Sequence, residues 1–178
     1  MSSWLPKDAW WMCVAPITGG STNRSPELLD RIIDQFNVET EPRYQRTAEG
    51  TKCNIFACDV TRALACEVPQ RELINNQLVQ QNANAMVEWF RGVRAIEQGW
   101  SEITMQVARA RADAGFPVIA CQRNPTGPGH IVVGRPAPAT AAEDGVLWIA
   151  QAGGKNSKLM RVIEAFLPGI PVRYYFHN

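Results

Sequence analysis

The sequence predicts an α+β domain with helices in its first half and an antiparallel sheet in its second. The chain has 178 residues, and domains cluster at roughly 100–150 residues, so one domain over residues 1–178 is expected, with its core over about residues 25–178. Helical periodicity prevails before residue 115, and short runs rich in β-branched and aromatic residues follow. Helices followed by strands are typical of an α+β domain.

Apolar spacing and capping residues place the helices. Ser25 suits an N-cap and is followed by proline at the first helical position, so a helix is expected over residues 26–36. A second helix begins at or near Cys53 and ends before the breaker Val68-Pro69. Further helices are expected over residues 82–94, 104–114 (stopped by Gly115) and 157–166.

Four short runs in the second half predict strands of one antiparallel sheet, because Gly and Pro clusters bound each of them. They cover residues 117–122, 130–135, 146–151 and 172–177. If the second and third pair as a hairpin with matched ends, Gln151 lies opposite His130.

Charge and hydropathy exclude several classes of function. Lys and Arg number 18 and Asp and Glu 17, a net charge of +1, so nothing favours binding to nucleic acid. The apolar runs are far shorter than the ~20 residues that span a bilayer, so a soluble protein with no membrane span is expected. The N-terminus does not resemble a signal peptide, which predicts synthesis in the cytoplasm. Trp4, Trp10 and Trp11 are expected to pack the N-terminal segment onto the domain.

Five cysteines and two histidines limit the chemistry. Five thiols cannot all pair within one chain, and their spacing does not match a small secreted disulfide framework. Cys53 and Cys58 are near zinc-ligand spacing, but on a helix they diverge by about 140°. No second Cys/His pair completes such a site. We therefore expect no metal and no cofactor.

Cys53 is the candidate nucleophile. A thiolate at a helix N-terminus is favoured by the helix dipole, and Lys52 adds positive charge beside it. The first helical turn also offers free backbone N–H groups that can serve as an oxyanion hole. The alternative is that Cys53 is simply a small buried hydrophobe.

His130 is the candidate general base, because it follows a loop of turn-forming residues and begins an apolar strand. The alternative to a catalytic role is that His130 is a strand-end histidine bonded to the backbone. His177, next to the C-terminus, is expected at the surface or in the packing of the last strand.

Gln151 is the candidate third residue, able to orient the imidazole through its side-chain carbonyl. Asn156 and Asp59 are alternatives for this place. Asp59 lies about 240° around the helix from Cys53, which argues against it. A pair between Asp59 and Arg62, at i and i+3, is the simpler expectation.

Four segments resemble bacterial papain-fold peptidoglycan hydrolases, close to the NlpC-type and CHAP-type amidases. They are TKCNIFACDV at 51–60, NANA at 82–85, PGHIVVGRP at 128–136 and AQAG at 150–153. The similarity runs from about residue 44 to residue 177. It implies a papain-like, NlpC-type fold, in which the N-terminal helices, including the Cys helix, pack on the C-terminal antiparallel β-sheet.

The resemblance implies a cysteine amidase that hydrolyses an amide bond in the peptide stems or cross-links of peptidoglycan. Cys53 would attack the carbonyl, His130 would move the proton, and Gln151 would fix the ring. Asn54 and Asn84 are implied as substrate-binding residues, although a polar helix residue explains Asn84 equally well. Cys58 and Cys66 depart from the family pattern, because they stand where small or apolar residues are usual.

Action on the cell wall, in the periplasm, requires a delivery route. The short chain favours a type VI secretion effector that enters a target cell, with a cognate immunity protein in the producer. Release by a phage holin and service in a larger machine are the other routes. Two further functions remain open: a Cys-His toxin that cleaves or deamidates a host protein, and a non-catalytic binding or immunity-type module with structural thiols.

Overall fold

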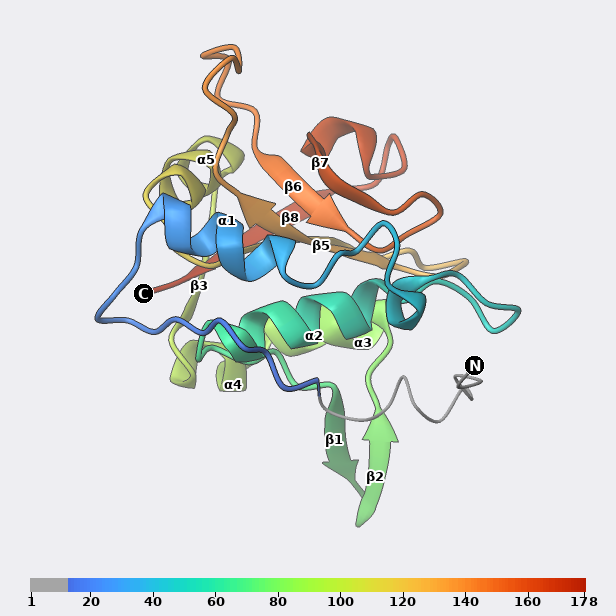
Figure 1. The fold of residues 1–178 in the computed structure, drawn as a ribbon. Coiled ribbons are helices and arrows are strands. Elements are labelled where there is room, and N and C mark those ends of the chain that lie inside the picture. The colour runs from blue at the N-terminus through green and yellow to red at the C-terminus, as the bar shows by residue number, and fades with distance from the viewer. Residues whose placement is uncertain (1–12) are drawn as a thin grey trace.

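The computed structural model describes residues 13–178, and its architecture is α+β (Figure 1). The main sheet is six-stranded and antiparallel, in the order β3-β8-β4-β5-β6-β7. Its strands are β3 (Trp100–Ile103), β4 (Val118–Gln122), β5 (His130–Arg135), β6 (Trp148–Gln151), β7 (Ser157–Arg161) and β8 (Val172–His177). A separate hairpin, β1 (Arg71–Ile74) and β2 (Gln77–Gln80), projects away from this sheet (Figure 1).

The helices follow the capping residues of the sequence. Ser25, Asn82 and Thr104 each accept a hydrogen bond from a backbone N–H of the helix they cap, which satisfies a donor that the helix leaves open. The helices are α1 (Pro26–Asp34), α2 (Cys53–Ala63), α3 (Ala83–Arg91), α4 (Val93–Glu97) and α5 (Met105–Asp113), with 3₁₀ turns η2 (Pro42–Tyr44) and η3 (Val162–Glu164).

The main sheet separates two hydrophobic clusters, because successive side chains of a strand point to opposite faces. Ile119 and Cys121 of β4 belong to the larger cluster, which they share with α1, α2 and α3. Val118 and Ala120 of the same strand belong to the smaller cluster, together with Ala108 and other residues of α5 and β8. Helices therefore cover both faces of the sheet.

Three parts of the sequence-based prediction are wrong or incomplete. Residues 157–166 form β7 and η3 rather than a helix, because β7 pairs with β6 as an edge strand and this pairing overrides local preference. The helix expected over 82–94 is interrupted at Gly92 and becomes α3 and α4. The hairpin β1–β2 and strand β3 were not predicted.

The register between β5 and β6 also differs from the matched-ends prediction. Val133 pairs with Ala150 and Arg135 with Trp148, so Gln151 falls opposite Val132 rather than opposite His130. The difference is two residues, and side chains two residues apart share a face of the sheet. Gln151 and His130 therefore still project from the same face.

Helix α2 is buried along almost its whole length and carries one acidic residue into the interior. The Asp59 carboxylate accepts hydrogen bonds from Arg43 Nε at 2.6 Å and from the Tyr44 hydroxyl at 2.9 Å. Arg62 Nη1 lies 3.3 Å from the same carboxylate, which confirms the i, i+3 pair. A buried carboxylate is tolerated only with such partners, so this cluster fixes α2 against the η2 turn.

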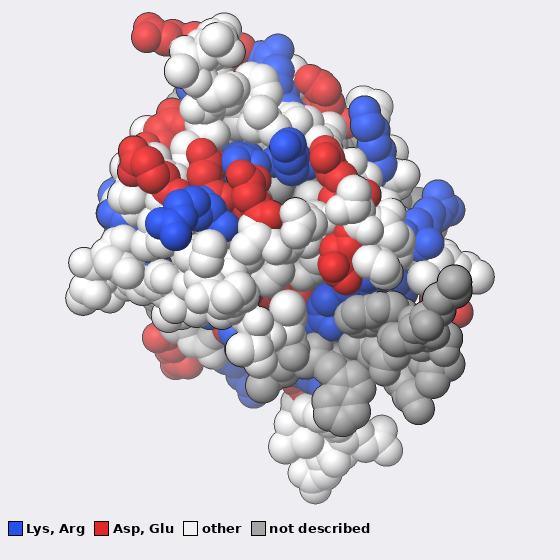
Figure 2. Space-filling view, in the orientation of Figure 1, with Lys and Arg blue, Asp and Glu red and all other residues white. Residues whose placement is uncertain are grey.

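The surface and the N-terminus bear on the remaining expectations. Acidic and basic side chains are interspersed on the face shown in Figure 2 rather than gathered by sign. Over residues 13–178, the chain forms no helix with the length and apolar character needed to cross a bilayer. The expectation for Trp4, Trp10 and Trp11 falls outside the described residues.

Asp59→Asn is expected to lower the free energy of unfolding by about 3–5 kcal/mol, because it removes the carboxylate that Arg43 and Arg62 share in the interior. Urea unfolding followed by circular dichroism measures this loss. Glu88→Gln is the matched control: Glu88 pairs with arginines at a half-exposed site, where an ion pair contributes about 0–1 kcal/mol. Equal losses in the two variants would contradict the structural role of Asp59.

Candidate active site

Cys53 is the first residue of α2, as the sequence predicted. The helix starts here because Lys52 leaves the helical region of backbone space and its carbonyl accepts the first helical hydrogen bond, from Phe56 N–H at 3.0 Å. Lys52 supplies no side-chain cap, and no acidic residue lies in the first turn. The positive end of the helix therefore faces the thiol without a competing carboxylate.

A cleft of about 690 Å³ reaches the Cys53 side chain. Its walls come from three parts of the chain that are distant in sequence: the segment entering α2, the junction of β2 with α3, and the loop between β4 and β5. The lining residues are Glu49, Gly50, Thr51, Lys52, Cys53, Asn54, Ile55, Gln80, Asn82, Ala83, Asn84, Gly127, Pro128 and Gly129.

His130 is the first residue of β5 and is half-buried. Its Nε2 lies 2.8 Å from Oε1 of Gln151, whose side chain is buried. The ring also meets the ring of Phe166 edge-on, with centroids 5.5 Å apart. These contacts on two sides restrict the rotation of the imidazole.

The second hydrogen bond of Gln151 determines the tautomer of His130. Gln151 Nε2 donates to the backbone carbonyl of Lys155 at 2.9 Å, so the amide turns its oxygen toward the imidazole. A carbonyl oxygen only accepts, so His130 Nε2 carries the proton. The other ring nitrogen, Nδ1, is then the one left for Cys53.

The thiol and the imidazole shift each other's protonation. Burial alone would raise the pKa of Cys53, but the hydrogen bond and positive charge of His130, helped by Ile131 N–H and the Thr51 hydroxyl, bring it below the ordinary value of 9.0. Burial would lower the pKa of His130, but its interaction with Cys53, and secondarily with Gln151, raises it. Both shifts favour a thiolate beside an imidazolium.

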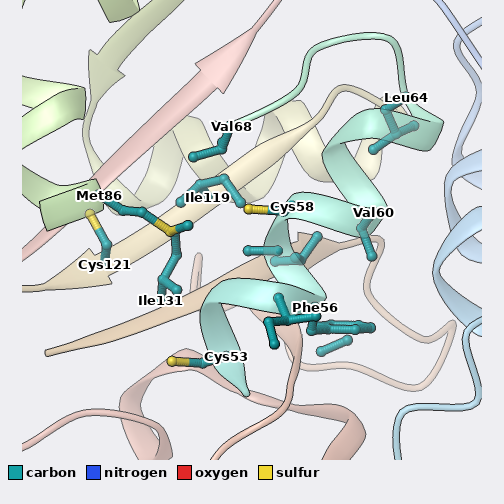
Figure 3. Close-up of a cluster of buried hydrophobic side chains, with 14 of the residues drawn as sticks. Cys53, Phe56, Cys58, Val60, Leu64, Val68, Met86, Ile119, Cys121 and Ile131 are labelled. Atoms are coloured by element: carbon teal, nitrogen blue, oxygen red, sulfur yellow. The ribbon is translucent and has the colours of Figure 1, made fainter. Parts of the chain in front are cut away.

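The other four cysteines are free thiols with the opposite shift. Burial raises the pKa of Cys58, of Cys121 and, to about 12, of Cys66. Burial also raises the pKa of Cys13. Figure 3 shows Cys58 pointing into the hydrophobic cluster, and Cys53, a buried member of the same cluster, at the first turn of the helix.

The two alternatives for the third residue lie elsewhere. Asp59 is engaged by Arg43, Tyr44 and Arg62. Asn156 accepts a hydrogen bond from Gly153 N–H at 3.0 Å and donates to backbone carbonyls of the segment 38–44. Asn156 thus holds the turn after β6, and of the three candidates Gln151 is the one at the ring.

Asn54 and Asn84, the expected substrate-binding residues, line the cleft but bond to the protein backbone. Asn54 is buried, and its Nδ2 donates to the carbonyl of Gln81 at 2.9 Å. Asn84 Nδ2 donates to the carbonyls of Asn124 and Gly127, each at 3.0 Å. A direct role of either residue in binding substrate stays a prediction.

His177 packs edge-on against Trp100 and lies 2.7 Å from the carbonyl of Gln98 through Nε2. It is half-buried at the end of β8, which agrees with the expected position at the surface or in the packing of the last strand.

Several neighbours of the catalytic candidates were missed in the sequence. Thr51 Oγ1 lies 3.9 Å from Cys53 Sγ. The position of Thr51 two residues before the cysteine could have indicated this contact. Phe166 reaches His130 because the Gln122 side chain bonds to the backbone at Leu167 and Ile170. That contact depends on chain folding over long separations, so no local pattern indicated it.

Among residues 13–178, no group of three or more His, Cys, Asp and Glu side chains is placed to hold a metal ion. A comparison with protein-family models and with curated proteins finds nothing that matches this chain. The fold brings together a thiol, an imidazole and an amide at this site.

Cys53 is expected to be the first thiol that iodoacetamide alkylates at neutral pH, because its pKa is lowered while burial raises the others. Its rate should fall only when the pH drops below the lowered pKa. In His130→Ala the midpoint of the Cys53 alkylation rate should move upward, since burial is then opposed only by the Ile131 N–H and the Thr51 hydroxyl. Peptide mass spectrometry measures the rates; equal rates for Cys53 and Cys13 would contradict the ion pair.

Proposed function

We propose that this protein is a cysteine amidase that hydrolyses an amide bond in bacterial peptidoglycan, with Cys53 as nucleophile. The observation that carries the proposal is that Cys53, which lines the cleft, bonds to His130, and that His130 in turn bonds to Gln151. A thiol activated by a base, which a third group orients, is the arrangement that thiol acyl transfer requires. We also propose that the fold is papain-like and of NlpC type, because a helix that begins with the cysteine packs on a strand that begins with the histidine.

In the first half of the reaction, the Cys53 thiolate attacks the carbonyl carbon of the scissile amide. The oxygen gains negative charge, which the N–H groups of the first turn of α2 stabilise. His130 Nδ1–H gives its proton to the departing amine as the C–N bond breaks. The product is a thioester between Cys53 and the acyl part of the substrate, together with a free amine.

In the second half, water attacks the thioester. His130, now neutral, accepts a proton from this water through Nδ1, and the C–S bond breaks as the tetrahedral intermediate collapses. The carboxylic acid leaves, and the thiolate-imidazolium pair is restored. Gln151 keeps Nε2 protonated and bonded throughout, so that Nδ1 stays directed at the thiol.

The composition of the cleft supports a short polar peptide as substrate. Of its lining residues, Glu49 and Lys52 carry charge, and glycine, alanine and amide side chains make up most of the remainder. The stem peptides of peptidoglycan are short and bear small and polar side chains. The assignment to the cell wall itself rests on the resemblance of the four sequence segments to peptidoglycan amidases.

Delivery and partners follow from this substrate. A wall hydrolase made in the cytoplasm acts in the periplasm, and we propose transfer into a target cell by a type VI secretion apparatus. A producing cell would then need an immunity protein that closes the cleft at Cys53. The competing function, cleavage or deamidation of a host protein, uses the same three residues and differs only in the substrate.

Cys53→Ala and His130→Ala are each expected to abolish activity on purified sacculi, because each removes a group that forms or breaks a covalent bond. Gln151→Ala should reduce activity less, since the amide only orients the ring. Circular dichroism should show that all three variants remain folded. Near-normal turnover in Cys53→Ala would eliminate the mechanism.

Mass spectrometry of muropeptides identifies the substrate and the bond broken. The expected result is new amine termini in digests by the wild-type protein and none in digests by Cys53→Ala. Unchanged sacculi, combined with release of ammonia or new termini from protein substrates, would instead assign the same residues to a toxin that acts on proteins.

The pH dependence of kcat/KM should be bell-shaped. The acidic limb reflects formation of the thiolate and lies below the ordinary thiol pKa, because His130 lowers the pKa of Cys53. The alkaline limb reflects loss of the imidazolium and lies above the ordinary histidine pKa, because Cys53 raises it. A single ascending limb near pH 9 would indicate that the ion pair does not form.

A further inference from the structure

The loop between β4 and β5 decides where His130 stands. It spans residues 123–129, and Gly129 immediately precedes His130. Gly127, Pro128 and Gly129 also form part of the cleft wall. A shift of this loop would therefore move the base and the wall of the cleft together.

One side chain from outside the loop holds the loop backbone at two positions, Asn124 and Gly127. Asn84 Oδ1 accepts from Asn124 N–H at 2.9 Å, and Nδ2 donates to the carbonyls of Asn124 and Gly127 at 3.0 Å each. Both Nδ2 hydrogens are thus engaged by the protein. Asn84 lies in the first turn of α3, which Asn82 caps, so the amide extends from a rigid element.

The loop is also shaped to receive this amide. A Cβ atom added at Gly129 would lie 2.4 Å from Asn84 Oδ1 and 2.9 Å from the carbonyl oxygen of Gln122. Both distances are shorter than real contacts allow, so the glycine permits the backbone to approach the amide closely. Both residues contribute to this fit. Asn84 uses its amide oxygen and both amide hydrogens in bonds to the loop, and Gly129 has no side chain that would clash with the amide.

We infer that Asn84 is a positioning residue, which holds His130 against Cys53 by fixing the loop, rather than a residue that binds substrate. This inference rests on the proposed function, because the pair it serves is the proposed nucleophile and base. The hydrogen bonds of the Asn84 side chain among the described residues go to the backbone of Asn124 and Gly127, and not to Cys53 or His130. Its effect must pass through the backbone of residues 124–129.

The test is the pH dependence of Cys53 alkylation in Asn84→Ala, read by peptide mass spectrometry with iodoacetamide as probe. The midpoint should move upward, because a loosened His130 stabilises the thiolate less. In sacculus assays kcat should fall by about 10- to 100-fold with a smaller change in KM, as displacement of a catalytic group predicts. Loss of a substrate contact would instead raise KM and leave the alkylation midpoint in place.

Asn82→Ala is the matched control. It removes a neighbouring amide that caps the same helix through Ala85 N–H at 2.9 Å and makes no hydrogen bond to the loop among the described residues. Asn82→Ala should lower the melting temperature about as much as Asn84→Ala does, but it should not move the midpoint of Cys53 alkylation. A midpoint that moves equally in Asn82→Ala would overturn the inference, since general loosening of α3 would then explain the shift.

Gly129→Ala tests the same contact between Asn84 and the β4–β5 loop, with the change made in the loop. The added methyl group must displace Asn84 or the loop, so the midpoint should shift in the same direction. In the double variant Asn84→Ala/Gly129→Ala the shifts should be less than additive, because the clash with the amide is gone. Full additivity would mean that the two residues act independently and would contradict the inference.

The outcomes distinguish this inference from the proposed function. If the wild-type midpoint already equals that of an ordinary thiol and His130→Ala does not move it, the proposed function fails. If the wild-type midpoint is low and depends on His130 but stays unchanged in Asn84→Ala, the positioning role alone is wrong.

Discussion

The packing of helix α2 on strand β5 is the constraint on which the site depends. Cys53 opens the helix and His130 opens the strand, so docking one element on the other brings the thiol and the imidazole together. Helices and strands hold their ends more firmly than loops do, which favours a preorganised pair. The same packing buries the thiol, and burial would raise its pKa if His130 did not face it.

Burial of α2 has a second consequence, which links the two ends of the site. Asp59 needs partners inside the protein and finds them in Arg43 and Tyr44. The backbone of the same segment accepts hydrogen bonds from Asn156, which orders the turn that follows Gln151. Asp59 and Asn156, the two alternatives to Gln151 as third catalytic residue, thus both stabilise the site through the segment 38–44. Asp59 anchors the helix that begins at Cys53, and Asn156 anchors the turn that follows Gln151.

Elements with local causes could be predicted from the sequence. Ser25 before proline indicated α1, and runs rich in β-branched and aromatic residues indicated β5 and β8 with their observed bounds. Elements that depend on distant partners could not be predicted. Strand β7 contains good helix formers and is extended because β6 pairs with it. The Asn84 contact with the β4–β5 loop joins residues about forty positions apart, and no periodicity records such a contact.

The sequence alone determined which side chains were available: five thiols and two imidazoles, with one thiol at a helix start and one imidazole at a strand start. It also determined the face of Gln151, because alternation along a strand survives a register error of two residues. Only the tertiary structure decided the partner of the imidazole, the tautomer and the direction of the pKa shifts. These depend on distances between segments and on burial, which arise from the packing of the whole chain and not from any local pattern.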